Sequence, residues 1–194
     1  MIGGVILAGG ASRRFGGMKQ TALFQGRPLL QHAVDAMSAV GRIERLVVVL
    51  GANAEVIRPR IEFGRAALTI CSDWREGRSA SLRAGLGAFE RAPDALIICL
   101  GDQPRVSAAV IDRVIAEGLA AGAPAARASY GRRLGHPVLL RAPLVARISQ
   151  LRGDGVARPL LSGCPVHAVR FSDPTVGMDV DTAEDLRSLR RAAN

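Results

Sequence analysis

The stretch VILAGGASRRFGGMK occupies residues 5–19 and decides the fold. A short apolar run ends at Gly9-Gly10, as in a strand that leads into a tight loop. Glycines let a ligand approach the main chain closely, and free N–H groups in such a loop can bind an anion. Arg13, Arg14 and Lys19 add positive charge, and Lys19 is the only lysine in the protein. We therefore expect a strand followed by a loop that binds an anionic ligand.

A plain strand-to-helix turn would explain Gly9-Gly10 alone, but not these glycines together with Arg14, Gly16 and Lys19. The loop is not a Walker A motif, because no Gly-Lys-Ser/Thr opens a helix here. It is not a dinucleotide fingerprint either, because Gly-x-Gly-x-x-Gly fits no register. We therefore expect this loop to bind its anionic ligand in a way that differs from both of these motifs.

The loop resembles the signature of the MobA-like nucleotidyltransferases, which include the molybdenum cofactor guanylyl- and cytidylyltransferases. The shared pattern is Leu7-Ala8-Gly9-Gly10-x-Ser12-x-Arg14-x-Gly16-x-x-Lys19. The resemblance implies that the nucleotide contacts Leu7, Ala8, Gly9, Gly10 and Lys19. It implies catalytic roles for Arg14 and Lys19.

The length of 194 residues and an apolar content of 48% predict one folded domain, residues 1–194. The net charge of +9 is compatible with nucleic acid, an anionic membrane or a phosphorylated substrate. Nucleic acid is disfavoured as a partner, because the arginines are scattered and aromatic residues make up only 4%. No apolar run approaches the ~20 residues of a spanning helix, so no membrane is expected.

The three cysteines Cys71, Cys99 and Cys164 are far apart in the sequence and form no Cys-x-x-Cys pair. This spacing favours buried free thiols over a disulfide framework or a cysteine metal site. Free thiols are typical of a reducing compartment, which predicts a cytoplasmic protein.

Apolar runs alternate with helix-like segments along the chain. The expected strands are 6–7, 46–50, 68–71, 96–100, 138–140 and 166–171, and the expected helices are 28–40, 54–60, one from Ser79 or Ser81, one capped by Ser107 and one capped by Thr182 with Asp185. This order predicts an α/β fold: a single Rossmann-like domain with a mainly parallel sheet and helices on both faces. Residues 121–135 have the composition of a loop. Ligands of such sheets bind beyond the carboxyl ends of the strands.

Two acidic segments are candidate metal ligands. Asp102 follows an apolar run and Gly101, and a carboxylate at a strand exit suits a hard cation, although a turn aspartate before Pro104 is the simpler explanation. Asp179 and Asp181 alternate along an extended piece, so only one is expected to face Asp102, and Asp181 is assigned to the helix that follows. The resemblance favours Asp102 and Asp179 as ligands of Mg²⁺, and a catalytic role for Asp102.

Two further segments complete the resemblance. The segment after residue 71 is similar to the base-binding segment of cytidylyltransferases and implies nucleotide contacts from Asp73, Gly77, Ser79 and Ser81, although a serine N-cap is the simpler explanation for either serine. Segments 135–138 and 153–161 resemble the acceptor side of the molybdopterin cytidylyltransferases, which implies acceptor binding by His136, Asp154 and Arg158.

The resemblance implies Mg²⁺-dependent transfer of a nucleoside monophosphate from CTP or GTP to molybdopterin, with release of pyrophosphate. The first loop has Leu-Ala-Gly-Gly, as in guanylyl enzymes, whereas the later motifs favour CTP. A molybdoenzyme or its chaperone is the protein partner that this role implies. The alternatives are a sugar-phosphate or other small-phosphate nucleotidyltransferase, and a non-catalytic nucleotide-binding protein.

Overall fold

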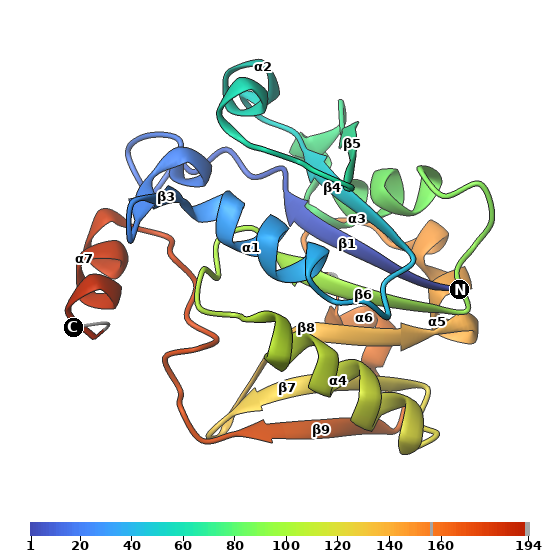
Figure 1. Ribbon diagram of the computed structural model, residues 1–194. Coiled ribbons are helices and arrows are strands. Elements are labelled where there is room, and N and C mark those ends of the chain that lie inside the picture. Colours follow the sequence, from blue (N-terminus) through green and yellow to red (C-terminus); the bar gives the residue numbers. More distant parts are fainter. Residues whose placement is uncertain (156, 193–194) are drawn as a thin grey trace.

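A seven-stranded sheet forms the centre of the protein, with strand order β5-β4-β1-β6-β8-β7-β9 (Figure 1). The computed structural model describes residues 1–155 and 157–192, without the side chains of residues 157 and 158. The strands are β1 (Ile2–Ala8), β4 (Arg45–Leu50), β5 (Ala67–Ile70), β6 (Ala95–Leu100), β7 (Ala125–Tyr130), β8 (Arg133–Arg141) and β9 (Val166–Phe171). They run parallel except β8, which is antiparallel to β6 and β7. The predicted mainly parallel α/β sheet is confirmed.

Helices cover both faces of the sheet (Figure 1). Helices α1 (Leu29–Ser38) and α4 (Ala108–Ala120) pack on one face, and α3 (Arg78–Gly87) and α5 (Ala142–Ala146) pack on the other. Strand β1 shows why: Val5 and Leu7 contact one core, whereas Ile6 and Ala8 contact the other. A strand buried on both faces is apolar throughout, as its sequence is.

The remaining elements are short or peripheral. They are η1 (Lys19–Thr21), β2 (Leu23–Phe24), β3 (Arg27–Pro28), α2 (Ala54–Ile57), η2 (Arg58–Arg60), η3 (Trp74–Glu76), η4 (Arg147–Gln150), α6 (Ala157–Leu161) and α7 (Ala183–Ala192). The expected cap of α7 is confirmed, because the Asp185 N–H donates to Thr182 Oγ1 (3.1 Å) and the Thr182 N–H donates to the Asp185 carboxylate (2.7 Å). Within the described residues, no helix has the length and apolar character needed to cross a membrane.

The prediction of a loop over residues 121–135 is wrong, because this segment holds β7 and the start of β8. Strand β7 is rich in alanine, which is a poor strand former. The structure explains the small residues: α4 packs on β7 so closely that a Cβ atom on Gly118 would lie 2.6 Å from the Cβ of Ala126. Close packing of helix on strand therefore determines this sequence, and strand propensity does not.

The close contact at Gly118 predicts that Gly118→Ala destabilises the protein. Alanine normally favours a helix over glycine by about 1 kcal/mol. Here its methyl group would overlap Ala126 and Leu139, and overpacking of a core costs about 1–3 kcal/mol. Chemical denaturation should show a lower free energy of unfolding. Gly87→Ala is the control, because Gly87 ends α3 with no atom within 4 Å of its added Cβ, and it should be neutral or stabilising.

Candidate functional site

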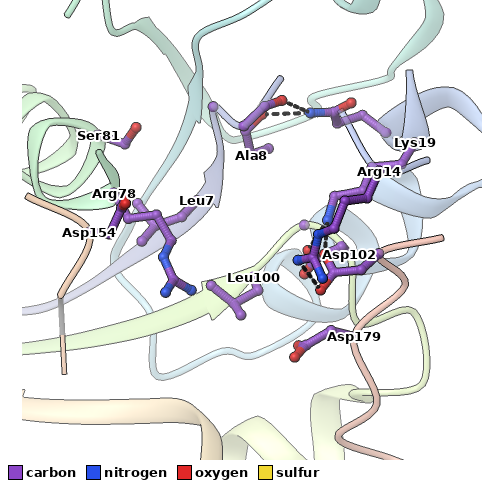
Figure 2. A pocket seen from close by; sticks show the side chains of 15 residues that line it. Leu7, Ala8, Arg14, Lys19, Arg78, Ser81, Leu100, Asp102, Asp154 and Asp179 are labelled. Atoms are coloured by element: carbon purple, nitrogen blue, oxygen red, sulfur yellow. Dashed lines mark hydrogen bonds and ion pairs between the residues drawn. The ribbon is translucent and has the colours of Figure 1, made fainter. Parts of the chain in front are cut away.

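The ends of β1 and β6 lie side by side, as expected for parallel strands, and the Gly101 N–H donates to the Leu7 carbonyl (3.0 Å). A cavity of about 530 Å³ opens at this edge of the sheet. Figure 2 shows Arg14, Lys19, Asp102 and Asp179 on one side of it, and Arg78, Ser81 and Asp154 on the other. Residues of the loop after β1 and of the two acidic segments therefore share one cavity with residues of the segments after residue 71 and at 153–161.

In the loop after β1, the carbonyl oxygens of residues 8–10 are hydrogen-bonded, whereas the N–H groups that follow are not. The carbonyls of Ala8 and Gly10 accept hydrogen bonds from the side chain of Gln20, and the carbonyl of Gly9 accepts one from the Ala52 N–H (3.1 Å). Within residues 1–155 and 157–192, the main-chain N–H groups of residues 9–12 make no hydrogen bond. A run of unpaired N–H groups is an anion-binding feature, as the sequence predicts.

Lys19 connects the loop to the acidic segments. Its Nζ donates to Asp102 Oδ2 (2.6 Å) and to Asp181 Oδ1 (2.9 Å), and Arg14 donates to the other oxygen of Asp181 (2.8 Å). Burial lowers the pKa of Lys19, but the two carboxylates outweigh it and raise that pKa above its ordinary value. Lys19 is therefore a fixed positive charge at the edge of the cavity.

Asp102 has a coordination position available. Burial raises the pKa of Asp102 above its usual range, although Lys19 opposes this, and the nearby Asp179 and Asp181 raise it further. Its buried Oδ1 has no hydrogen-bond partner among the described residues. A buried carboxylate oxygen without a donor is costly for the fold, and a cation would compensate it.

Asp179 and Asp181 both line the cavity together with Asp102, so the prediction that they point to opposite faces, with only one toward Asp102, is wrong. Segment 178–181 is not a β-strand, and alternation therefore does not apply. Asp179 accepts from Gln103 Nε2 (2.7 Å) and from Arg133 (2.9 Å). The assignment of Asp181 to the helix start is also wrong, because its carboxylate pairs with Lys19 and Arg14 while Asp185 caps α7.

The acidic residues fit a cation that takes most of its ligands from elsewhere. In the described part of the chain, no group of three or more His, Cys, Asp or Glu side chains comes together as a ligand set. Mg²⁺ commonly uses one or two carboxylates together with substrate phosphates and water. Asp102 and Asp179 match that requirement in type and number.

Of the two residues that the resemblance assigns to the nucleotide, Ser81 lines the cavity and Gly77 lines an adjoining hollow. Gly77 has φ +106°, and a Cβ atom there would lie 2.6 Å from the Gly153 carbonyl carbon. Ser81 lines the cavity and contacts the loop, since a Cβ on Gly9 would lie 2.7 Å from Ser81 Oγ. Glycine is thus required at position 77, where the segment before α3 packs on residues 153–154.

Ser79 and Asp73 do not line the cavity, which corrects their predicted contact with the nucleotide. Ser79 is fully buried, and its N–H donates to the Gly153 carbonyl (3.1 Å). Asp73 lies at a separate small hollow with Cys71 and Arg83. Ser79 therefore has a structural role at the start of α3.

The three predicted acceptor residues have different outcomes. Asp154 lines the cavity opposite Lys19 (Figure 2). His136 lies on β8, is partly buried, and is not among the cavity-lining residues. The side chain of Arg158 lies outside the described residues.

His136 is expected to stay neutral down to acidic pH. Burial, with the positive charges of Arg127 and Arg78, lowers its pKa from 6.5 to about 3. Between these values the unfolded chain binds a proton that the folded chain does not, so stability falls as the pH drops below 6.5. Between pH 7 and pH 5 we expect a loss of about 1–2 kcal/mol from this group. Urea denaturation at the two pH values checks this, and a His136→Gln variant with the same loss would contradict it.

Several residues that shape the cavity are not predicted from the sequence. They are Gln20, Arg78, Gln103 and Arg133, together with the role of Asp181. Gln20 directly follows Lys19, and Arg78 directly follows Gly77, so adjacency in the sequence was the signal that could have identified them. Arg133 lies 46 positions from its partner Asp179, and only the folded sheet brings the two together.

Comparisons with known proteins agree with this geometry. A family model described as "MobA-like NTP transferase domain" matches residues 4–170. A protein named nicotine blue oxidoreductase, from Paenarthrobacter nicotinovorans, is 33% identical, covering 96% of this chain and 95% of its own length. A protein named molybdenum cofactor guanylyltransferase, from Shewanella piezotolerans, is 27% identical, and the match covers 98% of this chain and 93% of that protein.

Solved structures give the same fold. Rv0371c from Mycobacterium tuberculosis H37Rv has a TM-score of 0.85 and 27% identity, covering 98% of this chain and 97% of its own. A second crystal structure of that protein is described as a complex with manganese, with a TM-score of 0.82, 26% identity and 98% coverage of both chains.

Proposed function

Because the chain belongs to the MobA-like NTP transferase family, we propose that it transfers a nucleoside monophosphate from CTP or GTP to a phosphorylated acceptor. The observation that carries this proposal is Lys19, whose ammonium group connects the carboxylates of Asp102 and Asp181 beside a loop of unpaired N–H groups. A triphosphate needs both features: donors for its oxygens and balanced charge around them.

In the proposed reaction, an oxygen of the acceptor phosphate attacks the α-phosphorus of the nucleotide. A new bond forms between that oxygen and the α-phosphorus, the bond from the α-phosphorus to the β-phosphate oxygen breaks, and pyrophosphate leaves with that electron pair. The nucleophile is already an anion, so no general base is required. Catalysis then consists of positioning and electrostatic stabilisation.

Each part of the cavity has a role in this reaction. The N–H groups of residues 9–12 would bind phosphate oxygens. Lys19 has three N–H donors, of which two bind Asp102 and Asp181, so the third can bind a phosphate oxygen. Arg14 is largely exposed and can turn toward the leaving pyrophosphate.

Asp102 and Asp179 are the proposed ligands of Mg²⁺. When bound, the metal would neutralise charge on the phosphate oxygens. The unpaired Oδ1 of Asp102 supports this assignment, and the manganese complex of the similar Rv0371c is consistent with a divalent cation in this fold.

The proposed acceptor is molybdopterin, and the proposed protein partner is a molybdoenzyme or its chaperone. This proposal rests on the acceptor-side resemblance and on the name of the Shewanella relative, molybdenum cofactor guanylyltransferase. That relative is a guanylyltransferase, which favours GTP, whereas the motifs at Ser81 and Asp154 favour CTP. Both nucleotides are therefore candidate donors.

A second candidate function is oxidoreduction, because the relative named nicotine blue oxidoreductase matches nearly the full length of this chain. The same loop could hold the diphosphate of a nicotinamide dinucleotide. Hydride transfer, however, would give no function to the carboxylates of Asp102 and Asp181 beside Lys19, which favours the transferase proposal.

The test is a transfer assay with purified protein, Mg²⁺, molybdopterin and either CTP or GTP, in which pyrophosphate and the dinucleotide product are measured. Product with one nucleotide supports the proposal and identifies the base. A parallel arm measures oxidation of NADH or NADPH with a quinonoid dye as acceptor. Dye reduction without pyrophosphate release would replace the transferase proposal with the second candidate.

A further inference from the structure

The side chain of Gln20 lies against the loop formed by residues 8–12. Only 3% of Gln20 is exposed, although it stands directly after Lys19 at the cavity. Burial of a polar amide is costly unless its hydrogen bonds are made. Its position therefore implies a specific set of partners.

All of these partners belong to the loop. Gln20 Nε2 donates to the carbonyl of Ala8 (3.1 Å) and to that of Gly10 (2.9 Å), and Oε1 accepts from Ser12 Oγ (3.1 Å). The amide uses both of its N–H groups on main-chain carbonyls. One side chain thus connects three alternate positions of the loop.

This arrangement determines which main-chain groups of the loop already have hydrogen-bond partners and which do not. With the Gly9 carbonyl bound by Ala52, three successive carbonyls are held by donors within the protein. Free carbonyl oxygens would repel an anion, whereas the N–H groups of residues 9–12 attract one. Ser12, with φ 54°, adopts a left-handed backbone that its bond to Gln20 helps to maintain.

We propose that Gln20 is a positioning residue, which orients the main chain of residues 8–12 to bind the phosphate chain of the nucleotide. It acts through the loop and does not contact the reacting atoms. The inference rests on the proposed function for the identity of the ligand, a nucleoside triphosphate.

The alternative is that Gln20 only stabilises the fold, and Gln31 provides a matched control. Gln31 is also buried, with 4% exposed. Its Nε2 donates to the Glu62 carbonyl (2.9 Å) and to Asp35 (2.9 Å), and its Oε1 accepts from the Glu62 N–H (2.8 Å). The number of bonds is the same, but Gln31 is not among the residues that line the cavity.

The experiment compares Gln20→Met with Gln31→Met by titration calorimetry. The probes are inorganic tripolyphosphate, CTP and GTP, with Mg²⁺. In metal sites, loss of a side chain that orients a ligand typically costs about 10- to 100-fold in affinity. By analogy, we expect Gln20→Met to raise the Kd of tripolyphosphate, and of the nucleotide that binds, by about 10- to 100-fold. Gln31→Met should change these values by less than about twofold, while thermal unfolding shows a similar loss of stability in both variants.

Equal binding by the two variants, or no binding of tripolyphosphate to the unmodified protein, would overturn the inference. If Gln20→Met does not fold, Ser12→Ala removes one bond to the same amide and should raise the tripolyphosphate Kd by about three- to tenfold. An unchanged Kd in that variant also overturns the inference.

The transfer assay separates the two proposals. Suppose that the unmodified protein transfers nucleotide, and that Gln20→Met equals Gln31→Met in activity and in tripolyphosphate Kd. The proposed function would then stand, and the role of Gln20 would not. If tripolyphosphate binding depends on Gln20 but no nucleotide is transferred to any acceptor, the role of Gln20 would stand and the proposed function would not.

Discussion

Asp102→Asn is expected to lower the rate of nucleotidyl transfer by about 10²- to 10³-fold, which is the usual cost of losing one group that stabilises transition-state charge. Asparagine has nearly the same shape but carries no charge. It would weaken the proposed metal site and leave Lys19 paired with Asp181 alone. The measurement is kcat in the transfer assay at saturating nucleotide and Mg²⁺.

The protein should remain folded in this variant, because burial already disfavours the ionised form of Asp102. Asp112→Asn is the matched control. Asp112 lies on α4 and pairs with Arg42 (2.9 Å) on the surface. Its loss should leave kcat unchanged. If Asp102→Asn kept full activity, Asp102 would be neither a metal ligand nor a catalytic residue.

The sequence predicted the part of the site that lies at strand ends. Apolar runs before Gly9-Gly10 and before Asp102 indicate buried parallel strands, and parallel strands bring their carboxyl ends to one edge. That rule predicts that the loop after β1, which contains Lys19, lies near Asp102. It does not predict that the two side chains are in contact. The start of β1 at Ile2 was not predicted, because Gly3 and Gly4 are poor strand formers. Packing favours glycine there, because a Cβ on Gly3 would lie 2.6 Å from the Phe89 ring and a Cβ on Gly4 would lie 2.8 Å from the end of Met37.

The remaining differences arise from contacts between distant segments. Asp179 and Asp181 follow β9, and their orientation depends on Gln103, Arg133, Lys19 and Arg14, none of which is near in sequence. No periodicity in segment 178–181 could report those partners. Gln20 is a similar case, since its role appears only when the loop carbonyls are traced to their donors.

Lys19→Met should also lower kcat by about 10²- to 10³-fold, and unlike Asp102→Asn it should destabilise the protein at neutral pH. Removing one partner from a buried ion pair typically costs about 3–5 kcal/mol, because the other charge is left uncompensated. Here Asp102 would lie unpaired and close to Asp179 and Asp181. Thermal unfolding at pH 7 should therefore show a clear decrease in Tm, whereas Arg42→Met, which breaks the surface pair with Asp112, should show little change.

The pH dependence of this loss identifies its cause. Without Lys19, the folded-state pKa of Asp102 should rise further above the unfolded value, since burial and the neighbouring carboxylates all act in that direction. The folded variant then binds a proton that the unfolded chain releases as the pH rises above about 4. Its deficit relative to the unmodified protein should shrink from pH 7 to pH 5.

The double variant Lys19→Met/Asp102→Asn separates the ion pair from the packing of the lysine side chain. With no charge left at either position, most of the lost stability at pH 7 should return, while activity stays as low as in the single variants. Recovery of stability would show that Lys19 balances the charge of Asp102 in the fold, whereas the separate role of Lys19 in the reaction is read from kcat of the folded Lys19→Met single variant, in which Asp102 is unchanged. If the double variant were instead as unstable as Lys19→Met, the loss would come from packing of the lysine side chain and not from the ion pair.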